Sequence, residues 1–313
     1  RALKETFWDG KQWGFPAYSI VWGVAYNKKM MTEVGVDPEN PFTTWEEFID
    51  VCQKLKNAGH VPLGGGLKDG WLPGWLAFYF GQQDYDNTND AIAAFKRERS
   101  YTDPKCSRWL EKVQELIDKG FYNDDIQSLD FYQGQQLIEN DQAAMTLHTH
   151  AYAQTLANTM GDDVIGFAKH PVFGDGELAS YVAAASQVFV LPKSSKHKEE
   201  GIGFLKFLQE EENLKALYDY TRAIVPNVNF KDEWVSGTVD AKVAEFLAND
   251  PTFFFQYVYP GPFEYEGLVP VLQRMFAGEL NAAEAAAELD AAIEKWTEQN
   301  PEQLEAYKKW DLS

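Results

Sequence analysis

An alternating run of apolar residues, followed by a capped amphipathic helix, constrains the fold of this chain more than any other feature. The alternation runs through residues 19–26, SIVWGVAY, and a period of two is typical of a β-strand. Thr43 and Glu46 have the spacing of a capping box, and Gly59 supplies the expected stop of the helix that they open. This pairing of a strand with a helix predicts an α/β architecture.

Strand-like and helix-like segments alternate along the rest of the chain. Further strands are predicted at residues 61–66, 143–147 and 181–191. Helices are predicted at residues 104–119, on both sides of the strand 143–147, on both sides of 210–212, and after the caps Asn281 and Pro301. The length of 313 residues suggests two domains.

Composition and charge restrict the class of protein further. Hydrophobic residues make up 45% of the chain, which is enough for more than one core. The formal net charge of −20 repels polyanions, so neither nucleic acid nor anionic lipid is an expected partner. Aromatic residues reach 15%, with 10 Trp, which suits ring stacking on a ligand, although large cores also bury Trp.

Targeting and redox signals are sparse. No apolar run is long enough for a transmembrane helix, and the opening RALKETFWDG lacks the pattern of a signal peptide, so we expect that any export signal has been removed or left out. Cys52 and Cys106 lie at helical spacing from apolar residues and are expected to face a core. The sequence leaves open whether their sulfurs form a disulfide.

Four segments in order resemble the extracellular solute-binding protein family 1, which includes maltodextrin-binding protein. They are DGKQWGFP with AYNKKM and TTWEEF, then ENDQAAMTL, then LPKSSKHKEEGIGFLKFL with the later IVP, and the alanine-rich terminal helix. Asn140 and Asp141 replace the Gly-Lys pair that is usual in the second segment. The resemblance covers essentially the whole chain and implies a carbohydrate-binding component of an ATP-driven (ABC) importer.

The resemblance also implies a two-lobed, type II periplasmic-binding-protein-like fold with hinge crossovers. The chain is expected to cross between lobes near Ile20, near Ala184 and at residues 257–261. This assigns residues 1–19 and 185–256 to the first lobe, and residues 20–184 and 262–313 to the second lobe. The second lobe is expected to be complete and the first partial, because family members begin with a long stretch of first-lobe elements before the DGK turn.

A site for a neutral sugar needs an aromatic platform and polar groups that donate and accept in pairs. Trp71 occupies the region where relatives place a stacking ring, and Lys68 and Asp69 could reach hydroxyls beside it. The alternative is that Trp71 and Trp75, four residues apart, form the buried start of a helix.

The tryptophan that relatives carry just after the second segment is absent here. His150 or Tyr152 could replace it as a smaller platform or as a hydroxyl partner, whereas Tyr152 could also simply pack between helices. His148 and His150 have a spacing compatible with a metal, but Zn²⁺ needs further ligands that the sequence does not nominate. No metal and no cofactor are therefore expected.

Residues at the expected crossovers form a second set of ligand candidates, because crossovers line the cleft in two-lobed binders. They are Tyr18, Ser19, Gln187, Asn227, Glu264 and Tyr265. Hinge packing is an equal alternative for Tyr18 and Tyr265, and Trp22 is expected in the core. The negative net charge disfavours uronic acids, although Lys68 or Arg222 could override it locally.

We expect a binding protein and not an enzyme. A glycoside hydrolase needs two carboxylates about 5–10 Å apart, and no cue singles out such a pair among the 48 Asp and Glu. That enzyme, and a metal-binding or peptide-binding receptor, remain the alternatives. The expected partners are a mono- or oligosaccharide and the permease subunits of an ABC transporter, and the protein is expected to be a monomer in the periplasm or a cell-surface lipoprotein.

Overall fold

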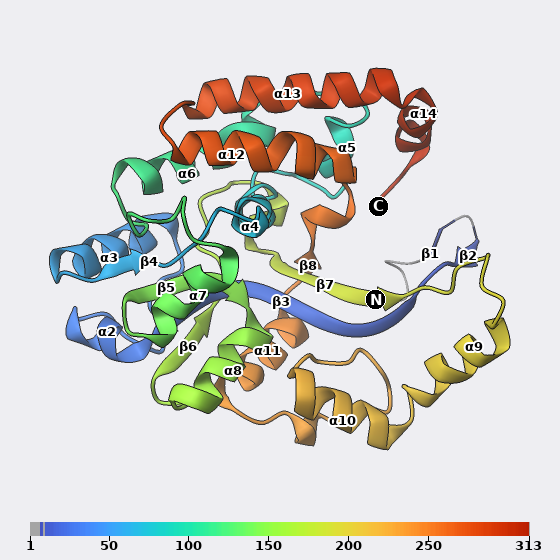
Figure 1. Cartoon of the computed structure of the whole chain (residues 1–313), viewed down its shortest axis with the longest axis horizontal. Helices are drawn as coiled ribbons and strands as arrows, with labels where there is room; N and C mark the ends of the chain where they lie inside the picture. Colours follow the sequence, from blue (N-terminus) through green and yellow to red (C-terminus); the bar gives the residue numbers. More distant parts are fainter. Residues whose placement is uncertain (1–6, 9, 313) are drawn as a thin grey trace.

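The computed structural model describes residues 7–8 and 10–312, and it shows a mixed sheet with helices on both faces (Figure 1). Asp9, in the predicted DGK turn, lies outside the described residues. The strands are β1 Phe7–Trp8, β2 Lys11–Gln12, β3 Phe15–Asn27, β4 Val61–Leu63, β5 Ala143–Thr149, β6 Ile165–Ala168, β7 Val182–Phe189 and β8 Thr252–Phe253.

Helices fill most of the intervals between the strands. The α-helices are α2 Lys28–Glu33, α3 Trp45–Asn57, α4 Trp71–Phe80, α5 Asp90–Ala93, α6 Pro104–Asp118, α7 Phe131–Glu139, α8 His150–Met160, α9 Lys198–Phe207, α10 Glu211–Thr221, α11 Thr238–Asn249, α12 Val269–Phe276, α13 Ala282–Gln299 and α14 Pro301–Lys309. Shorter turns are the 3₁₀ helices η1 Glu177–Ser180, η2 Asp232–Trp234 and η3 Phe255–Tyr257, and the π-helix η4 Phe263–Leu268.

The long strand β3 organises the six-stranded sheet, whose order is β4-β5-β3-β7-β8 with β6 also paired to β3. Its first half pairs antiparallel with β7, and its second half pairs antiparallel with β5 and β6. Strand β4 is parallel to β5, and β8 is parallel to β7. Figure 1 shows β3 crossing the middle of the molecule between helices α12 and α13 on one side and α8 and α10 on the other.

Alternation along β3 explains why both faces of the sheet are covered. Trp22, Val24 and Tyr26 belong to a large core shared with α3, α4, α6, α12 and α13. Val21 and Ala25 point to the other face and belong to a smaller core shared with α8 and α11. Successive side chains of a strand point to opposite faces, so one apolar segment serves both cores.

Most predicted elements are confirmed, and several of their boundaries are shifted. The capping box of α3 is formed by Thr44 and Glu47, one residue later than predicted. The strand predicted at 61–66 ends at Leu63, and of the glycines that follow it, Gly64 lies close to the backbone of Gly134 and Gly66 to that of Asp130. Cys52 and Cys106 are both buried, as predicted, and both are free.

Two of the predicted crossovers lie side by side in the sheet. Ile20 pairs with Ala185, and Val21 pairs with Ala184. Helix α11, although inside the predicted first-lobe range 185–256, shares the smaller core with α8 and β6 of the predicted second lobe. The division into lobes at these residues stays a prediction.

Helix α9 exposes an apolar face. None of its residues is buried, and Ile202, Phe204 and Phe207 are 47%, 56% and 49% exposed. Val188, near the end of β7, and Val190, just after it, are 37% and 64% exposed. We call these five residues the α9 patch.

Replacing Phe204 and Phe207 with Ser is expected to reduce the fluorescence of a bound apolar dye by about half, because contiguous exposed apolar surface binds such dyes and promotes association. The midpoint of thermal unfolding is expected to change little, since neither side chain is buried. Lys206→Ser, on the same helix, controls for the lower helix propensity of serine. Unchanged dye binding in the double variant would contradict this role of the α9 patch.

Candidate ligand site

Asp69 joins the two helices that carry the exposed aromatic side chains. Its Oδ1 accepts from the Trp71 backbone N–H at 3.4 Å, and its Oδ2 accepts from the Phe131 N–H at 3.1 Å. A carboxylate suits these positions because both N–H groups lie at helix N-termini. Asp69 therefore positions α4 and α7 relative to each other, whereas the sequence had nominated it for contact with ligand hydroxyls.

Trp71 is exposed, and Trp75 one turn later is not. The Trp71 side chain is 53% accessible, while Trp75 is 7% accessible and packs beneath it with ring centroids 6.5 Å apart. Gly70 precedes α4 with φ of +79°, a conformation that other residues rarely adopt. The buried-start alternative thus holds for Trp75 only, and Trp71 remains available as a platform.

Ring contacts extend from Trp71 and Trp75 toward α8. Phe131 lies 6.3 Å from Trp71 and 4.6 Å from Trp75 between ring centroids. His148 lies 5.3 Å from Phe131 and 5.1 Å from Trp75, and it stacks on Tyr152 at 3.8 Å. These five rings form one continuous aromatic wall.

A second branch extends from Trp75 toward the predicted crossovers. Trp22 lies 6.5 Å from Trp75 and stacks on Phe254 at 4.2 Å, and Phe254 lies 5.2 Å from Tyr257. The Tyr257 hydroxyl donates to the Ser186 carbonyl at 2.7 Å. The aromatic wall is therefore continuous with the point where β3, β7 and η3 meet.

Glu264 places a carboxylate against α4 at Gly74, one turn after Trp71. A methyl group added at Gly74 would come within 2.8 Å of its Oε1, so the side chain lies directly against the helix that carries Trp71. Gln256 Nε2 donates to both carboxylate oxygens, at 3.4 and 3.2 Å. Partial burial raises the pKa of Glu264, against the lowering effect of the Gln256 hydrogen bond.

His150 does not line any surface in this structure, so its nomination as a platform was wrong. Its side chain is 0% exposed, and Nδ1 accepts from the Val21 backbone N–H at 3.0 Å. The cause is the position of His150 at the first turn of α8, which packs on β3. Tyr152 is half-buried, stacks on His148 and donates its hydroxyl to Glu139 at 2.7 Å.

The crossover candidates divide into two groups. Tyr18 and Gln187 are partly exposed and directly paired between β3 and β7, and the neighbouring Ser19 hydroxyl lies 3.5 Å from that of Ser186. Tyr265 is 71% exposed.

Asn227 and Arg222 are engaged elsewhere. The Asn227 amide donates to Gln209, and the Arg222 guanidinium pairs with the fully buried Asp240 at 2.8 Å. Only 12% of the Arg222 side chain is exposed, so it is not available to an anionic ligand as the sequence had suggested. Lys68 is exposed on the loop before Trp71.

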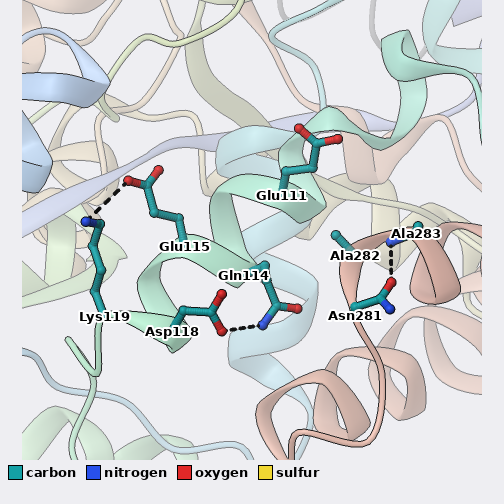
Figure 2. Close-up of a pocket in the computed structure, with 8 residues that line it drawn as sticks. All are labelled: Glu111, Gln114, Glu115, Asp118, Lys119, Asn281, Ala282 and Ala283. Carbon is teal, nitrogen blue, oxygen red and sulfur yellow. Dashed lines mark hydrogen bonds and ion pairs between the residues drawn. The ribbon is translucent and has the colours of Figure 1, made fainter.

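A separate hollow of about 590 Å³ lies between α6 and the start of α13 (Figure 2). Glu111, Glu115 and Asp118 give it an acidic lining, and Figure 2 shows Glu115 paired with Lys119. Glu115 also accepts from the Trp45 indole N–H at 2.7 Å. The hollow contains no ring of the aromatic wall and no residue nominated from the sequence.

The sequence did not nominate Phe131, His148 or Gln256 as parts of the candidate ligand site. Phe131 follows the capping residue Asp130, a local signal that predicts a helix start but not what the helix approaches. Long-range contacts bring α7 beside Trp71, among them the hydrogen bond from Phe131 to Asp69 and the close approach of Gly134 to Gly65.

Neither a metal-binding cluster nor a membrane-spanning helix is found among the residues that the structure describes. Within residues 7–8 and 10–312, no group of three or more potential metal ligands gathers. The Nδ1 atoms of His148 and His150 each accept a backbone N–H, from Thr149 and Val21. None of the described helices combines the length and apolarity that crossing a membrane requires.

Comparison with known proteins defines the class of protein to which this chain belongs. The chain belongs to the bacterial extracellular solute-binding protein family, whose model matches residues 2–215. This confirms the resemblance identified in the sequence. The family consists of binding proteins.

The individual relatives share only about a quarter of their aligned residues with this chain. The sn-glycerol-3-phosphate-binding periplasmic protein UgpB of Escherichia coli (strain K12) is 25% identical over 228 residues, which cover 63% of this chain and 48% of that protein. Its Salmonella typhimurium counterpart is 24% identical over 204 residues, covering 60% and 43%. The chain thus spans about half the length of the curated relatives that it matches.

Solved structures confirm the two-lobed fold. A chitin oligosaccharide binding protein superposes with a TM-score of 0.81 at 20% identity, over 95% of this chain and 74% of that chain. A sugar transporter from Bacillus licheniformis in complex with stachyose gives 0.75 at 16% identity, over 92% and 74%. Coverage of about three quarters of these neighbours agrees with a partial first lobe.

Proposed function

We propose that this chain is a substrate-binding protein that captures an uncharged mono- or oligosaccharide for import by an ABC transporter. The observation that carries the proposal is the exposed Trp71 ring at the head of the aromatic wall, with the Glu264 carboxylate, hydrogen-bonded by Gln256, against α4 at Gly74. A sugar presents an apolar C–H face to a ring and hydroxyls to paired polar groups.

The solved neighbours support a saccharide as the ligand. One of them is described as a chitin oligosaccharide binding protein and another contains stachyose. The curated relatives are described instead as binding sn-glycerol 3-phosphate, a small anionic ligand.

The mechanism that we propose is ligand-driven closure of two lobes about the crossovers. The ligand stabilises the closed form by contacts that exist only there. The register of Ile20 with Ala185 and the hydrogen bond from Tyr257 to Ser186 bring all three predicted crossover segments together, which supports a common hinge.

We propose binding without turnover. Of the two nominated carboxylates, Asp69 is unsuited to an acid or base role, since both of its oxygens accept helix N-terminal N–H groups. The remaining candidate, Glu264, has no second carboxylate nominated to act with it across a glycosidic bond.

The family supports a proposal for the cellular setting. We propose an exported monomer, held in the periplasm or at the cell surface by a lipid anchor, that delivers its ligand to permease subunits. The periplasmic descriptions of the curated relatives support this location.

Trp71→Ala is expected to weaken saccharide binding by roughly tenfold to a hundredfold, because the stacking surface is lost. Isothermal titration calorimetry with chitin oligosaccharides, stachyose, xylo-oligosaccharides and galactose measures this directly. Product analysis of the same mixtures reports any hydrolysis, and hydrolysed product would contradict binding without turnover.

Trp13→Ala is the matched control, because Trp13 is 47% exposed but lies next to β2, outside the aromatic wall. Equal loss of affinity in both variants, or no loss in Trp71→Ala, would remove Trp71 from the ligand site.

A further inference from the structure

Glu264 carries a negative charge that no cation neutralises. Its neighbours include the Gln256 amide, the Tyr259 side chain and Gly74 of α4, and no described Lys or Arg forms an ion pair with it. Its neighbour Glu266 differs in this respect, since Lys295 lies 3.9 Å away and the Glu266 side chain is 67% exposed.

The two cationic side chains nominated from the sequence, Arg222 and Lys68, do not neutralise the charge of Glu264. Arg222 is committed to Asp240 at 2.8 Å. Lys68 is exposed, and no ion pair within 4.0 Å links it to Glu264 in the described part of the chain. One exposed ammonium is strongly hydrated and does not provide the planar, bidentate recognition by which Arg binds phosphate.

We infer that Glu264 is a specificity-determining residue that excludes phosphorylated and other anionic solutes from the Trp71 site and leaves it to uncharged polyhydroxy ligands. This inference rests on the proposed function. A half-buried carboxylate repels a phosphate group, since like charges interact strongly at reduced dielectric. The same carboxylate accepts a charge-assisted hydrogen bond from a sugar hydroxyl.

The inference separates this chain from the curated relatives that are described as binding sn-glycerol 3-phosphate. The net charge of −20 acts in the same direction over longer range. Glu264 adds a local effect, which persists at ionic strengths that screen the surface field.

Calorimetric titration of the wild type, Glu264→Gln and Glu266→Gln with sn-glycerol 3-phosphate and inorganic phosphate, slightly above neutral pH, tests the inference. Neutral oligosaccharides are titrated in parallel. The wild type is expected to bind sn-glycerol 3-phosphate at least about tenfold more weakly than the best neutral saccharide. Glu264→Gln is expected to bind it at least about tenfold more tightly than the wild type, and Glu266→Gln to change by less than about threefold.

Tight binding of sn-glycerol 3-phosphate by the wild type would overturn the inference, and so would equal affinities in all three proteins. Failure of every neutral saccharide to bind would instead overturn the proposed function. The anion titrations then still decide the role of Glu264, because the comparison between Glu264→Gln and Glu266→Gln does not depend on the neutral ligand. Circular dichroism of each variant establishes that it is folded.

Discussion

Acidification from about pH 7 to about pH 4.5 is expected to destabilise this chain, because it contains buried neutral histidines. Burial lowers the pKa of His150 and of His170 to about 4, and it lowers the pKa of His148 well below its usual range. Arg222 beside His150 and Lys169 beside His170 act in the same direction. The unfolded chain therefore binds protons at these sites between about pH 6.5 and pH 4, where the folded chain does not.

The direction of the pH effect follows from the linkage between proton binding and folding. Stability falls with falling pH wherever the unfolded state binds more protons than the folded state. His150 and His170 each account for about 2 kcal/mol over this interval. Asp240 opposes them, since burial raises its pKa to about 6 and its folded form takes up a proton first, which offsets about 2 kcal/mol.

His150→Asn isolates one of these contributions. An Asn carbonyl can accept the Val21 N–H that His150 Nδ1 accepts at 3.0 Å, but it does not titrate. Urea unfolding at both pH values is expected to show a loss of stability about 2 kcal/mol smaller in this variant than in the wild type. His197→Asn, at a side chain that is 80% exposed, controls for the loss of an imidazole. An unchanged pH dependence in His150→Asn would refute the assignment.

Gly134→Ala is expected to lower the free energy of unfolding by at least about 3 kcal/mol or to prevent folding. A Cβ at this position would lie 2.5 Å from the Gly66 nitrogen and 2.8 Å from the Gly65 oxygen. Both atoms belong to backbone, so the conflict is not relieved by a side-chain rotation. The overlap disappears only if α7 moves away from Gly65 and Gly66, which lie in the glycine segment that leads to Trp71.

Gly203→Ala is the matched control, because Gly203 lies in the exposed helix α9 and a Cβ there meets nothing within 4 Å. This variant is expected to gain about 0.5–1 kcal/mol from the lower chain entropy of alanine. Urea unfolding of both variants at neutral pH measures the difference. A Gly134→Ala protein as stable as the wild type would mean that α7 and the glycine segment do not pack as described.

Local signals in the sequence were sufficient for most elements. Asp103 before Pro104 marked the start of α6, Asn281 marked the start of α13, and the alternation of residues 19–26 marked β3. The observed capping box lies one residue after the predicted one, because Thr43 and Thr44 are adjacent and each has a glutamate three residues later. Glu47 accepts from the backbone N–H of both Thr43 and Thr44, so the sequence offered two registers of nearly equal quality.

Side-chain roles at the site depended on contacts that no local pattern records. Asp69 was recognisable as a polar residue beside Trp71, yet its partner Phe131 lies 62 positions away. His150 follows an apolar strand, where a polar residue was expected at the surface. Its ring instead accepts a hydrogen bond from the backbone N–H of Val21, 129 positions earlier in the chain. Such pairings arise only when the strands and helices are assembled.

The amino-acid order alone was enough for the α/β class and for the family, since capping, periodicity and motif order are short-range properties of a chain, and Trp71 as a stacking ring stays a prediction. The tertiary structure decided which nominated groups are free for a ligand. It buried His150, committed Asp69 to two helix termini and paired Arg222 with Asp240, because burial and hydrogen-bond partners depend on distant segments. It also left Glu264 without a cation beside α4.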